Sequence, residues 1–317
     1  MGQRQGAVAD MAITPLLFRN MKRVLLTGST GFIGSHVTAE LLRRGYEVHA
    51  AVYGPPAPEQ PGLVQHELSL LDAPAVESFL AEHGFESLIH LAWYVGPKCH
   101  VHSLNVDWVA ASLHLLQAFA RHGGKSFLGA GTCSEYEYKY GYLTEDLTPT
   151  NPGTLYGNGK NAVYHLARLF CAQEGLAFKW PRIFNLYGPH EKPQRLMPSV
   201  ICSCLRGEDV RVSDCLKFQD YLHVEDTARG IVDVFESDLQ GAVNISSGMP
   251  VQLREIVCKI AELTGFKGNI LWGAIPAAFG DDLVVGNNER LKSIGWAPQY
   301  TLEEGLTQTI NWWKQHV

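Results

Sequence analysis

Short, continuously apolar segments alternate with amphipathic ones from Lys22 to about residue 130. Segments such as KRVLLTG, YEVHAAVY and SLIHLAW have the length and composition of β-strands, whereas IGSHVTAELLRRG and SLNVDWVAASLHLLQAFARHG repeat apolar positions at helical spacing. Strands that are apolar on both faces are typical of a parallel sheet covered by helices on each side. The pattern therefore predicts an α/β protein with a doubly wound parallel sheet.

The regular alternation ends after PRIFNLYGP, where Pro-containing segments and shorter helical patterns follow. YLHVEDTARGIVDVFE and AVNISS return to the helix and strand pattern of the first part. We therefore expect residues 21–184, with about 220–248, to form the doubly wound domain, and residues 185–219 and 249–317 to form a smaller mixed α/β lobe that binds the substrate. We expect residues 1–20, which precede the first strand, to be a disordered extension.

Composition narrows the classes of function. The 317 residues are 46% hydrophobic and 18% charged with a formal net charge of -6, so the chain can bury a core but offers no basic surface for nucleic acid. No apolar run reaches the roughly 18 residues of a membrane-spanning helix. The seven cysteines lack CxxC spacing, which argues against a disulfide framework and a zinc site, and we predict no metal. We expect a cytoplasmic protein that acts on a small molecule.

The segment TGSTGFIG follows the first predicted strand and opens a helix. Gly28 and Gly31 permit a tight turn and a close backbone approach, and Gly34 lets the helix pack closely on the strand. The unpaired N–H groups and the positive dipole end of a helix N-terminus attract phosphate, so the segment is predicted to bind a dinucleotide. The predicted contacts are Gly28, Thr30, Gly31, Phe32, Ile33 and Gly34.

Tyr156 and Lys160 lie four residues apart where a Gly-rich turn enters the amphipathic segment NAVYHLARLFCAQEG. A spacing of four places both side chains on one face of a helix. A free tyrosine has a pKa of about 10, and lowering it by about 3 units takes roughly 4 kcal/mol of differential interaction, part of which a nearby ammonium group can supply. The pair is therefore predicted to work as an acid–base group.

Several motifs occur together and in register. They are TGSTGFIG, LIHLAW, SLNVDW, SFLGAGTCSEY, Tyr156-x-x-x-Lys160, PRIFNLYGP, YLHVED and the tail GWAPQYTLEEGLTQTINWW. From Lys22 to about Trp313 the chain resembles the extended short-chain dehydrogenase/reductase family, in its branch of sugar-nucleotide epimerases, dehydratases and reductases. The resemblance implies a Rossmann-like, NAD(P)-binding larger domain and hydride transfer beside a carbonyl group.

The resemblance also implies catalytic roles. Tyr156 would donate a proton with the help of Lys160, and Thr132 would hydrogen-bond the developing alkoxide, with Ser134 as the alternative hydroxyl. Asn105 matches the family's helix asparagine, which supports a water relay behind the lysine. A capping or helix-kink amide is the other interpretation of Asn105.

Further cofactor contacts follow from the resemblance. Glu67 occupies the place of the acidic residue that meets the adenine amino group. The second predicted strand, VHAAVY, ends without the Asp or Glu that binds ribose hydroxyls in NAD-dependent members, and Arg43 or Arg44 could reach a 2'-phosphate. We therefore predict NADP as the preferred cofactor, with NAD as the alternative. The predicted contacts beyond the glycine-rich segment are Glu67, Leu68, Leu91, Ala92, Tyr156, Lys160 and Ile183.

The residues after Thr132 bear on the type of reaction. Dehydratases of this branch carry an Asp-Glu pair, or a single Glu, just after the threonine. Here Cys133 and Ser134 follow Thr132 and Glu135 lies one place late, so dehydration is disfavoured. The epimerases that form GDP-fucose use a cysteine two places before the tyrosine of this segment and a histidine in a GPH motif. Here His190 stands in LYGPH, but Ser134 holds the cysteine's place. Cys133, one position away, is either a shifted base or a small packed residue.

Two arginines that bind the substrate diphosphate in relatives are replaced here, one by Gln219 and one by residues 278–281. Arginine binds phosphate through two parallel hydrogen bonds, so their loss indicates another clamp or an unusual substrate. Arg195 and Lys217 are the candidate replacements, with solvated surface cations as the alternative. The predicted substrate-binding residues are Trp93, Ser134, Asn185, His190, Arg195, Lys217 and Gln219.

These observations predict a cytoplasmic, dimeric, NADP-preferring ketoreductase of a nucleotide-linked keto or deoxy sugar, with Tyr156 as proton donor. The alternatives are an epimerase that retains NAD, a reductase of a ketone without a nucleotide, and a non-catalytic NADP-binding sensor, against which the catalytic set argues. The homodimer is inferred from the resemblance and from the two long amphipathic helices that carry Asn105 and Tyr156. No nucleic-acid or membrane partner is predicted.

Overall fold

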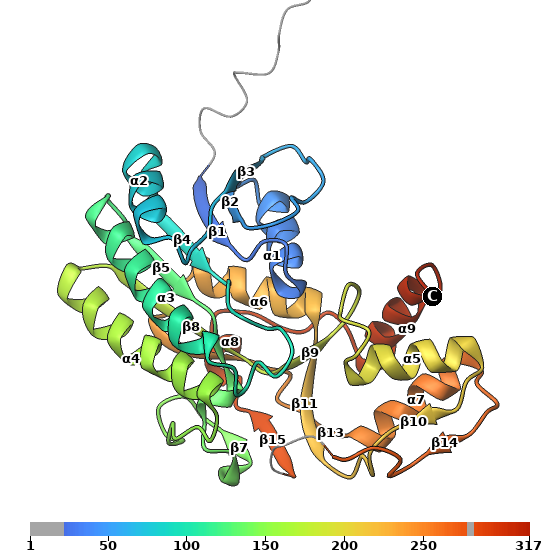
Figure 1. Cartoon of the computed structure of the whole chain (residues 1–317). Helices are drawn as coiled ribbons and strands as arrows, with labels where there is room; N and C mark the ends of the chain where they lie inside the picture. The colour runs from blue at the N-terminus through green and yellow to red at the C-terminus, as the bar shows by residue number, and fades with distance from the viewer. Residues whose placement is uncertain (1–21, 278–281) are drawn as a thin grey trace, which may run out of the picture.

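The computed structural model describes residues 22–277 and 282–317, which form a larger and a smaller lobe (Figure 1). The predictions made for residues 1–20 and 278–281 lie outside the described residues. The larger lobe contains a parallel sheet in the order β12-β8-β5-β4-β1-β2-β3, with β6 also paired to β8. This order confirms the predicted Rossmann-like, doubly wound fold. The strands are β1 (Arg23–Thr27), β2 (Glu47–Val52), β3 (Leu63–Glu67), β4 (Ser87–His90), β5 (Ser126–Gly129), β6 (Gly131–Thr132), β8 (Ala177–Ile183) and β12 (Gly241–Ile245).

Helices cover both faces of this sheet, which is why its strands are apolar throughout. Side chains alternate along a strand, so Leu25 packs into the core shared with α2, α3 and α4, whereas Val24 and Leu26 pack into the core shared with α1 and α6. These helices are α1 (Phe32–Arg43), α2 (Ala73–His83), α3 (Leu104–Arg121), α4 (Leu155–Glu174) and α6 (Val224–Glu236). Two short 3-10 turns, η1 (Cys133–Glu135) and η2 (Tyr138–Tyr140), follow β6.

The smaller lobe is built from helices and short strands (Figure 1). Its core is formed by Met197, Ile201, Ile256, Leu306 and neighbouring apolar residues. The strands form a mixed sheet in the order β13-β11-β15-β7, with β9 also paired to β11, and a separate parallel pair of β10 and β14. The elements are β7 (Tyr142–Leu143), β9 (Asn185–Tyr187), α5 (Leu196–Arg206), β10 (Val210–Arg211), β11 (Phe218–His223), β13 (Pro250–Gln252), α7 (Leu253–Thr264), β14 (Ile270–Leu271), β15 (Leu283–Gly286) and α9 (Leu302–Trp313), with α8 (Glu289–Lys292) packed on β12.

Strand β11 connects the two lobes. It pairs with β13 and β15 at its start and with β9 at its end, and the chain then enters α6 and β12 of the larger lobe. Asp220 is fully buried in β11 and accepts hydrogen bonds from the backbone N–H groups of Ser247, Gly248 and Gly286 at 2.7, 2.9 and 3.1 Å. A buried carboxylate with three backbone donors ties these segments together at the junction.

Within residues 22–277 and 282–317, no helix is long and apolar enough to cross a membrane. In the same ranges, no group of three or more His, Cys, Asp and Glu side chains could hold a metal ion.

Candidate active site

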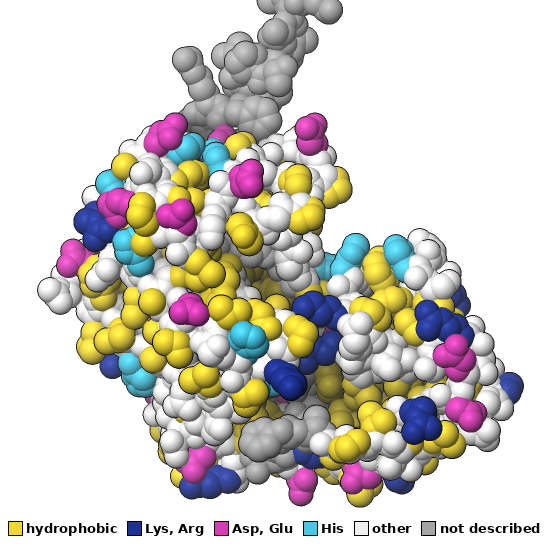
Figure 2. All heavy atoms as spheres, viewed as in Figure 1, with side chains coloured by type: hydrophobic (Ala, Val, Ile, Leu, Met, Phe, Trp, Pro, Cys, Tyr) yellow, Lys and Arg dark blue, Asp and Glu magenta, His cyan; other side chains and the backbone are white. Residues whose placement is uncertain are grey.

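A cavity of about 1510 Å³ lies at the carboxyl ends of β1, β4 and β5, where the larger lobe faces the smaller one. Figure 2 shows part of it as a hollow between the lobes. Sheet order reverses between β1 and β4, and doubly wound sheets bind ligands at such a switch point. Pockets for a single small ligand measure about 300–1,000 Å³, so this cavity has room for a dinucleotide and a second ligand.

The glycine-rich segment closes one end of the cavity with bare backbone. Gly28 adopts φ +77°, and a Cβ on it would lie 2.7 Å from the backbone nitrogen of Ala92. A Cβ on Gly34 would lie 1.9 Å from the Gly28 oxygen, so neither position admits a side chain. The N–H of Gly31 donates to the Gly28 carbonyl at 3.0 Å, and α1 begins directly afterwards. This cradle at a helix N-terminus fits a pyrophosphate, and all six residues predicted from the segment line the cavity.

The other predicted cofactor contacts surround this cradle, with one exception. Glu67 is exposed at the end of β3 and is not among the described residues that line the cavity. The lining residues of this group are Leu68, Leu91, Ala92, Tyr156, Lys160 and Ile183.

The two arginines that could reach a 2'-phosphate are engaged elsewhere. Arg44 forms ion pairs with Glu40 and Asp233 at 2.7 Å each, and Arg43 pairs with Glu40 at 2.7 Å. Neither arginine belongs to the described lining of the cavity, which at the end of β2 is formed by Ala51 and Tyr53. The structure therefore brings no arginine from α1 to the place predicted for the phosphate.

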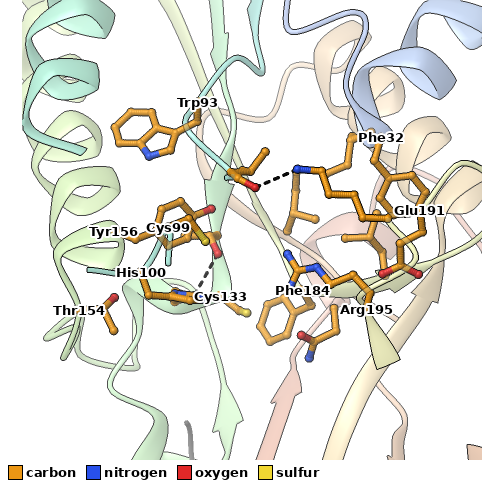
Figure 3. Close-up of a pocket in the computed structure, with 18 of the residues that line it drawn as sticks. Phe32, Trp93, Cys99, His100, Cys133, Thr154, Tyr156, Phe184, Glu191 and Arg195 are labelled. Atoms are coloured by element: carbon orange, nitrogen blue, oxygen red, sulfur yellow. Dashed lines mark hydrogen bonds between the residues drawn. The ribbon is translucent and has the colours of Figure 1, made fainter. Parts of the chain in front are cut away.

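Tyr156 points into the cavity from the first turn of α4 (Figure 3). Burial raises the pKa of its phenol, and a hydrogen bond with the Thr132 side chain acts in the opposite direction. Thr132 accepts a hydrogen bond from the Ser134 N–H at 3.2 Å, which leaves its own hydroxyl proton free to be donated. At neutral pH Tyr156 is thus a protonated group beside a hydrogen-bond donor.

Lys160 is buried one turn further along α4. Its Nζ donates to the Ala130 carbonyl at 2.8 Å and lies 4.0 Å from the ring centroid of Trp93. Burial lowers the pKa of Lys160 to about 7. The Ala130 carbonyl and the Trp93 ring therefore hold the Lys160 amine in place. Near neutral pH its charged and neutral forms are present in similar amounts.

Asn105 lies at the start of α3, outside the described lining of the cavity. Its Oδ1 accepts a hydrogen bond from Trp93 Nε1 at 2.9 Å, and its Nδ2 donates to the carbonyl oxygens of Cys99 and His102 at 2.7 and 2.8 Å. The side chain thus fixes the loop after β4, including the indole on which Lys160 rests. The predicted water relay through Asn105 stays a prediction.

Glu135 contacts the backbone of Thr132 on the side away from the cavity. Its carboxylate is fully buried, pairs with Arg182 Nε at 2.7 Å, and accepts hydrogen bonds from Trp180 Nε1 at 3.0 Å and from the Thr132 N–H at 2.9 Å. It is not among the described residues that line the cavity. A carboxylate held by these donors has a structural role, and it lies away from the space where a substrate proton would be removed.

Cys133 does line the cavity, but as a thiol. Burial raises its pKa to about 11, and its Sγ lies 3.4 Å from the Tyr138 hydroxyl. A thiol rather than a thiolate at neutral pH is a poor base. Of the two interpretations of this residue, the structure favours the packed side chain.

Six of the seven predicted substrate-binding residues reach the cavity, and His190 does not. His190 adopts φ +70° and packs against Trp312, with 4.8 Å between the ring centroids. Asn185 donates from Nδ2 to Oε1 of Gln219 at 3.0 Å, so these two predicted residues are joined. The six lining residues are Trp93, Ser134, Asn185, Arg195, Lys217 and Gln219.

Sequence reasoning missed several residues of the cavity wall, among them His100 and Glu191. The His100 carbonyl accepts a hydrogen bond from the Tyr156 N–H at 3.1 Å, and its ring stands edge-on to Tyr156 with 5.6 Å between centroids (Figure 3). Glu191 follows His190 directly and enters the cavity in its place. A chemically active residue one position from a motif was the signal that could have identified Glu191.

The fold, the glycine cradle and the Tyr156–Lys160 pair define a nicotinamide-dependent enzyme of the extended short-chain dehydrogenase/reductase type. Residues 24–246 match the model of the NAD dependent epimerase/dehydratase family, to which the chain belongs.

Known relatives catalyse several reactions. A dTDP-glucose 4,6-dehydratase from Streptomyces griseus is 29% identical, over 92% of this chain and 94% of the relative. The UDP-glucose 4-epimerase of Thermotoga maritima, solved with UDP-glucose, has a TM-score of 0.85 at 25% identity, over 93% of this chain and 99% of that one. The Thermus thermophilus UDP-glucose 4-epimerase, solved with NAD, has a TM-score of 0.84 at 27% identity, over 93% and 100%. The chain therefore belongs among the sugar-nucleotide epimerases, dehydratases and reductases.

Proposed function

We propose that this protein is a cytoplasmic ketoreductase that transfers hydride to a keto sugar linked to a nucleotide. One observation carries the proposal: Tyr156 and Thr132 face the cavity as a protonated donor and its helper, while Glu135, the carboxylate bonded to the Thr132 N–H, is engaged by Arg182 and Trp180. A reduction needs a proton donor but no carboxylate base. We assign the cofactor to the larger lobe and the substrate to the smaller one. The seven free thiols support a reducing compartment.

In this mechanism the bound nicotinamide supplies the hydride. Tyr156 donates its proton to the carbonyl oxygen, and the raised pKa of the phenol keeps that proton in place until negative charge develops. Thr132 donates a hydrogen bond to the same oxygen. Lys160 lies one helical turn away, and its ammonium group, when charged, stabilises the phenolate that remains.

The preference for NADP rests on the uncharged end of β2. Ala51 and Tyr53 line the cavity there, and neither would repel a 2'-phosphate. NAD is the alternative, and the pairing of Arg43 and Arg44 with carboxylates favours it. An epimerase that retains NAD is the second candidate function, and the same pairing of Arg43 and Arg44 supports it. Such an enzyme would use Tyr156, Thr132 and Lys160 first to oxidise the sugar and then to reduce it.

The experiment that separates these two functions starts from the purified protein. Mass spectrometry and absorbance detect any retained nicotinamide, and titrations with NADPH and NADH follow. An empty protein that prefers NADPH and oxidises it in the presence of a keto sugar nucleotide supports the reductase. Tightly retained NAD, with turnover that needs no external reductant, contradicts it in favour of the epimerase.

A further inference from the structure

Glu191 places a carboxyl group in the cavity, and the proposed mechanism gives this group no role. It lies between β9 and α5, on the wall opposite Tyr156 and His100, as Figure 3 shows together with Arg195. The neighbouring Lys192 reaches across the cleft, where its Nζ donates to the Val95 carbonyl at 3.1 Å. The segment that carries Glu191 is thus fixed against the loop after β4.

The carboxyl group is poorly satisfied within the protein. Its Oε2 is buried and has no hydrogen-bond partner among the residues that the structure describes. Leaving such an atom unpaired is costly, so a buried unpaired oxygen in a cavity wall calls for an explanation, and a hydrogen-bond donor on a ligand supplies one. Burial raises the pKa of Glu191 to about 8, while the nearby Arg195 acts in the opposite direction. Tyr221 also interacts with it, and burial together with Glu191 raises the pKa of that phenol.

The backbone explains why Glu191, and not the histidine of the motif, faces the cavity. His190 takes the left-handed φ of +70°, which turns its ring toward Trp312 and the next side chain toward the cleft. For a residue other than glycine this conformation is uncommon and costs on the order of 1 kcal/mol or more. The backbone strain thus lies at His190, the residue whose conformation orients the Glu191 side chain.

We propose that Glu191 is a specificity-determining residue that accepts a hydrogen bond from a hydroxyl group of the substrate's sugar ring. The inference rests on the proposed function, since it assumes a nucleotide sugar in the cavity. A sugar hydroxyl supplies the missing donor for Oε2, and it does so on the smaller-lobe wall, beside Arg195, rather than at the glycine cradle. The ribose of the cofactor carries the same hydroxyl chemistry, so the test must distinguish the two sources.

Binding measurements with Glu191→Ala and Glu191→Gln test the proposal. The probes are UDP-, dTDP-, CDP- and GDP-glucose, each compared with its free nucleoside diphosphate, and NADH and NADPH. Glu208→Ala and Glu208→Gln are the matched controls, because Glu208 is exposed on the smaller lobe and is not part of the described cavity lining.

We expect Glu191→Ala to weaken the best glucose nucleotide roughly 10-fold, the usual scale for losing one buried hydrogen bond. Affinity for the free diphosphate and for NADH or NADPH stays unchanged, and Glu191→Gln has a smaller effect. The midpoint of thermal unfolding without ligand stays the same or rises, because the variants remove an unsatisfied carboxyl group. A purely structural role would instead lower it.

Several results would overturn the proposal. A loss confined to NADH or NADPH assigns the hydroxyl to the cofactor ribose, and an equal loss for glucose nucleotide and free diphosphate assigns Glu191 to the nucleotide half. Unchanged glucose-nucleotide binding in Glu191→Ala refutes the residue's role but leaves the proposed function standing. Failure of the unmodified protein to bind any of the four glucose nucleotides refutes the proposed function itself.

Discussion

Burial of the Tyr156 phenol has a chemical consequence at the scale of a single residue. Its pKa is raised, so the folded protein presents a proton donor at neutral pH. Lys160, with a pKa lowered to about 7, gains charge readily when a negative ligand or a phenolate approaches. The raised phenol pKa is opposite to the lowering expected from the sequence: it keeps Tyr156 protonated but makes it a weaker acid than free tyrosine.

Replacing Tyr156 with Phe tests that role. The change removes the donated proton and keeps the ring, so we expect kcat for reduction of the keto sugar nucleotide to fall about 100-fold or more. Cofactor affinity, measured by fluorescence titration, should stay largely intact. Tyr140→Phe is the control, because Tyr140 is half exposed and lies outside the described cavity lining. Full activity in Tyr156→Phe would remove Tyr156 as the proton donor.

His90 affects stability rather than chemistry. It is buried at the end of β4, with Nδ1 2.7 Å from Thr27 Oγ1 and Nε2 2.9 Å from Ser112 Oγ, and burial together with Lys160 lowers its pKa to about 3. The unfolded chain binds a proton at this residue below its ordinary pKa of about 6.5, whereas the folded chain does not. The free energy of unfolding therefore falls as the pH drops from about 6.5 toward 3.

We expect His90 to account for about 2 kcal/mol of stability lost between pH 7 and pH 5. Urea unfolding at both pH values, compared between the unmodified protein and His90→Gln, isolates this contribution. The variant should show a smaller pH dependence by that amount, although His66, whose pKa is lowered to about 4, still contributes in the same direction. Equal pH dependence in both proteins would contradict the assignment to His90.

At the scale of elements, the loop between β4 and α3 organises the site. It supplies Trp93 beneath Lys160 and His100 beside Tyr156, and Asn105 holds it through three hydrogen bonds. Asn105 makes these bonds from the first turn of α3. The long helix α3 therefore fixes the loop that contacts Tyr156 and Lys160 of α4. Packing of α3 against α4 keeps both parts in register.

Truncating Asn105 to Ala should loosen this loop. The change leaves the Trp93 indole N–H and the Cys99 carbonyl without their partner, while the His102 carbonyl keeps its bond from the backbone N–H of residue 105. We expect the free energy of unfolding to fall by about 2–4 kcal/mol. Chemical denaturation measures the loss, and limited proteolysis should find new cleavage between residues 94 and 103. Asn311→Ala, an exposed asparagine on α9, is the control. A variant that keeps its stability but loses turnover would instead support the predicted water relay.

At the scale of the whole molecule, the sequence predicts the fold more completely than the site. Continuous apolar strands and a glycine-rich turn depend on local chemistry, so the parallel sheet and its cradle could be read from the chain. The directions of individual side chains depend on the backbone and on partners far apart in sequence. Arg44 was predicted within reach of a phosphate but pairs with Asp233 of α6. His190 was predicted to bind the substrate, but with its φ of +70° it lies outside the described cavity lining, which Glu191 joins instead.

The predicted homodimer is likewise a proposal about the whole molecule. Two apolar stripes with the same spacing face away from the sheet on the adjacent helices α3 and α4, which stand side by side in Figure 1. Val106, Leu166 and Leu169 are 60%, 52% and 61% exposed, an unusual degree for aliphatic side chains on one surface. The stripes are Val106, Ala110 and Leu113 on α3, and Ala162, Leu166 and Leu169 on α4, and the next position of each is a glutamine.

A Leu169→Glu substitution tests this surface. In a two-fold symmetric dimer the new charge occurs twice and loses water in each copy, so we expect the variant to elute as a monomer when size-exclusion chromatography with light scattering shows a dimer for the unmodified protein. Met249→Glu, which changes a 70% exposed residue just before β13 in the smaller lobe, should remain dimeric. A dimeric Leu169→Glu protein would move the interface to another face, and a monomeric unmodified protein would refute the dimer. Because the stripe on α4 begins at Ala162, less than two turns beyond Tyr156, the same measurement combined with an activity assay shows whether pairing of the helices supports the catalytic turn.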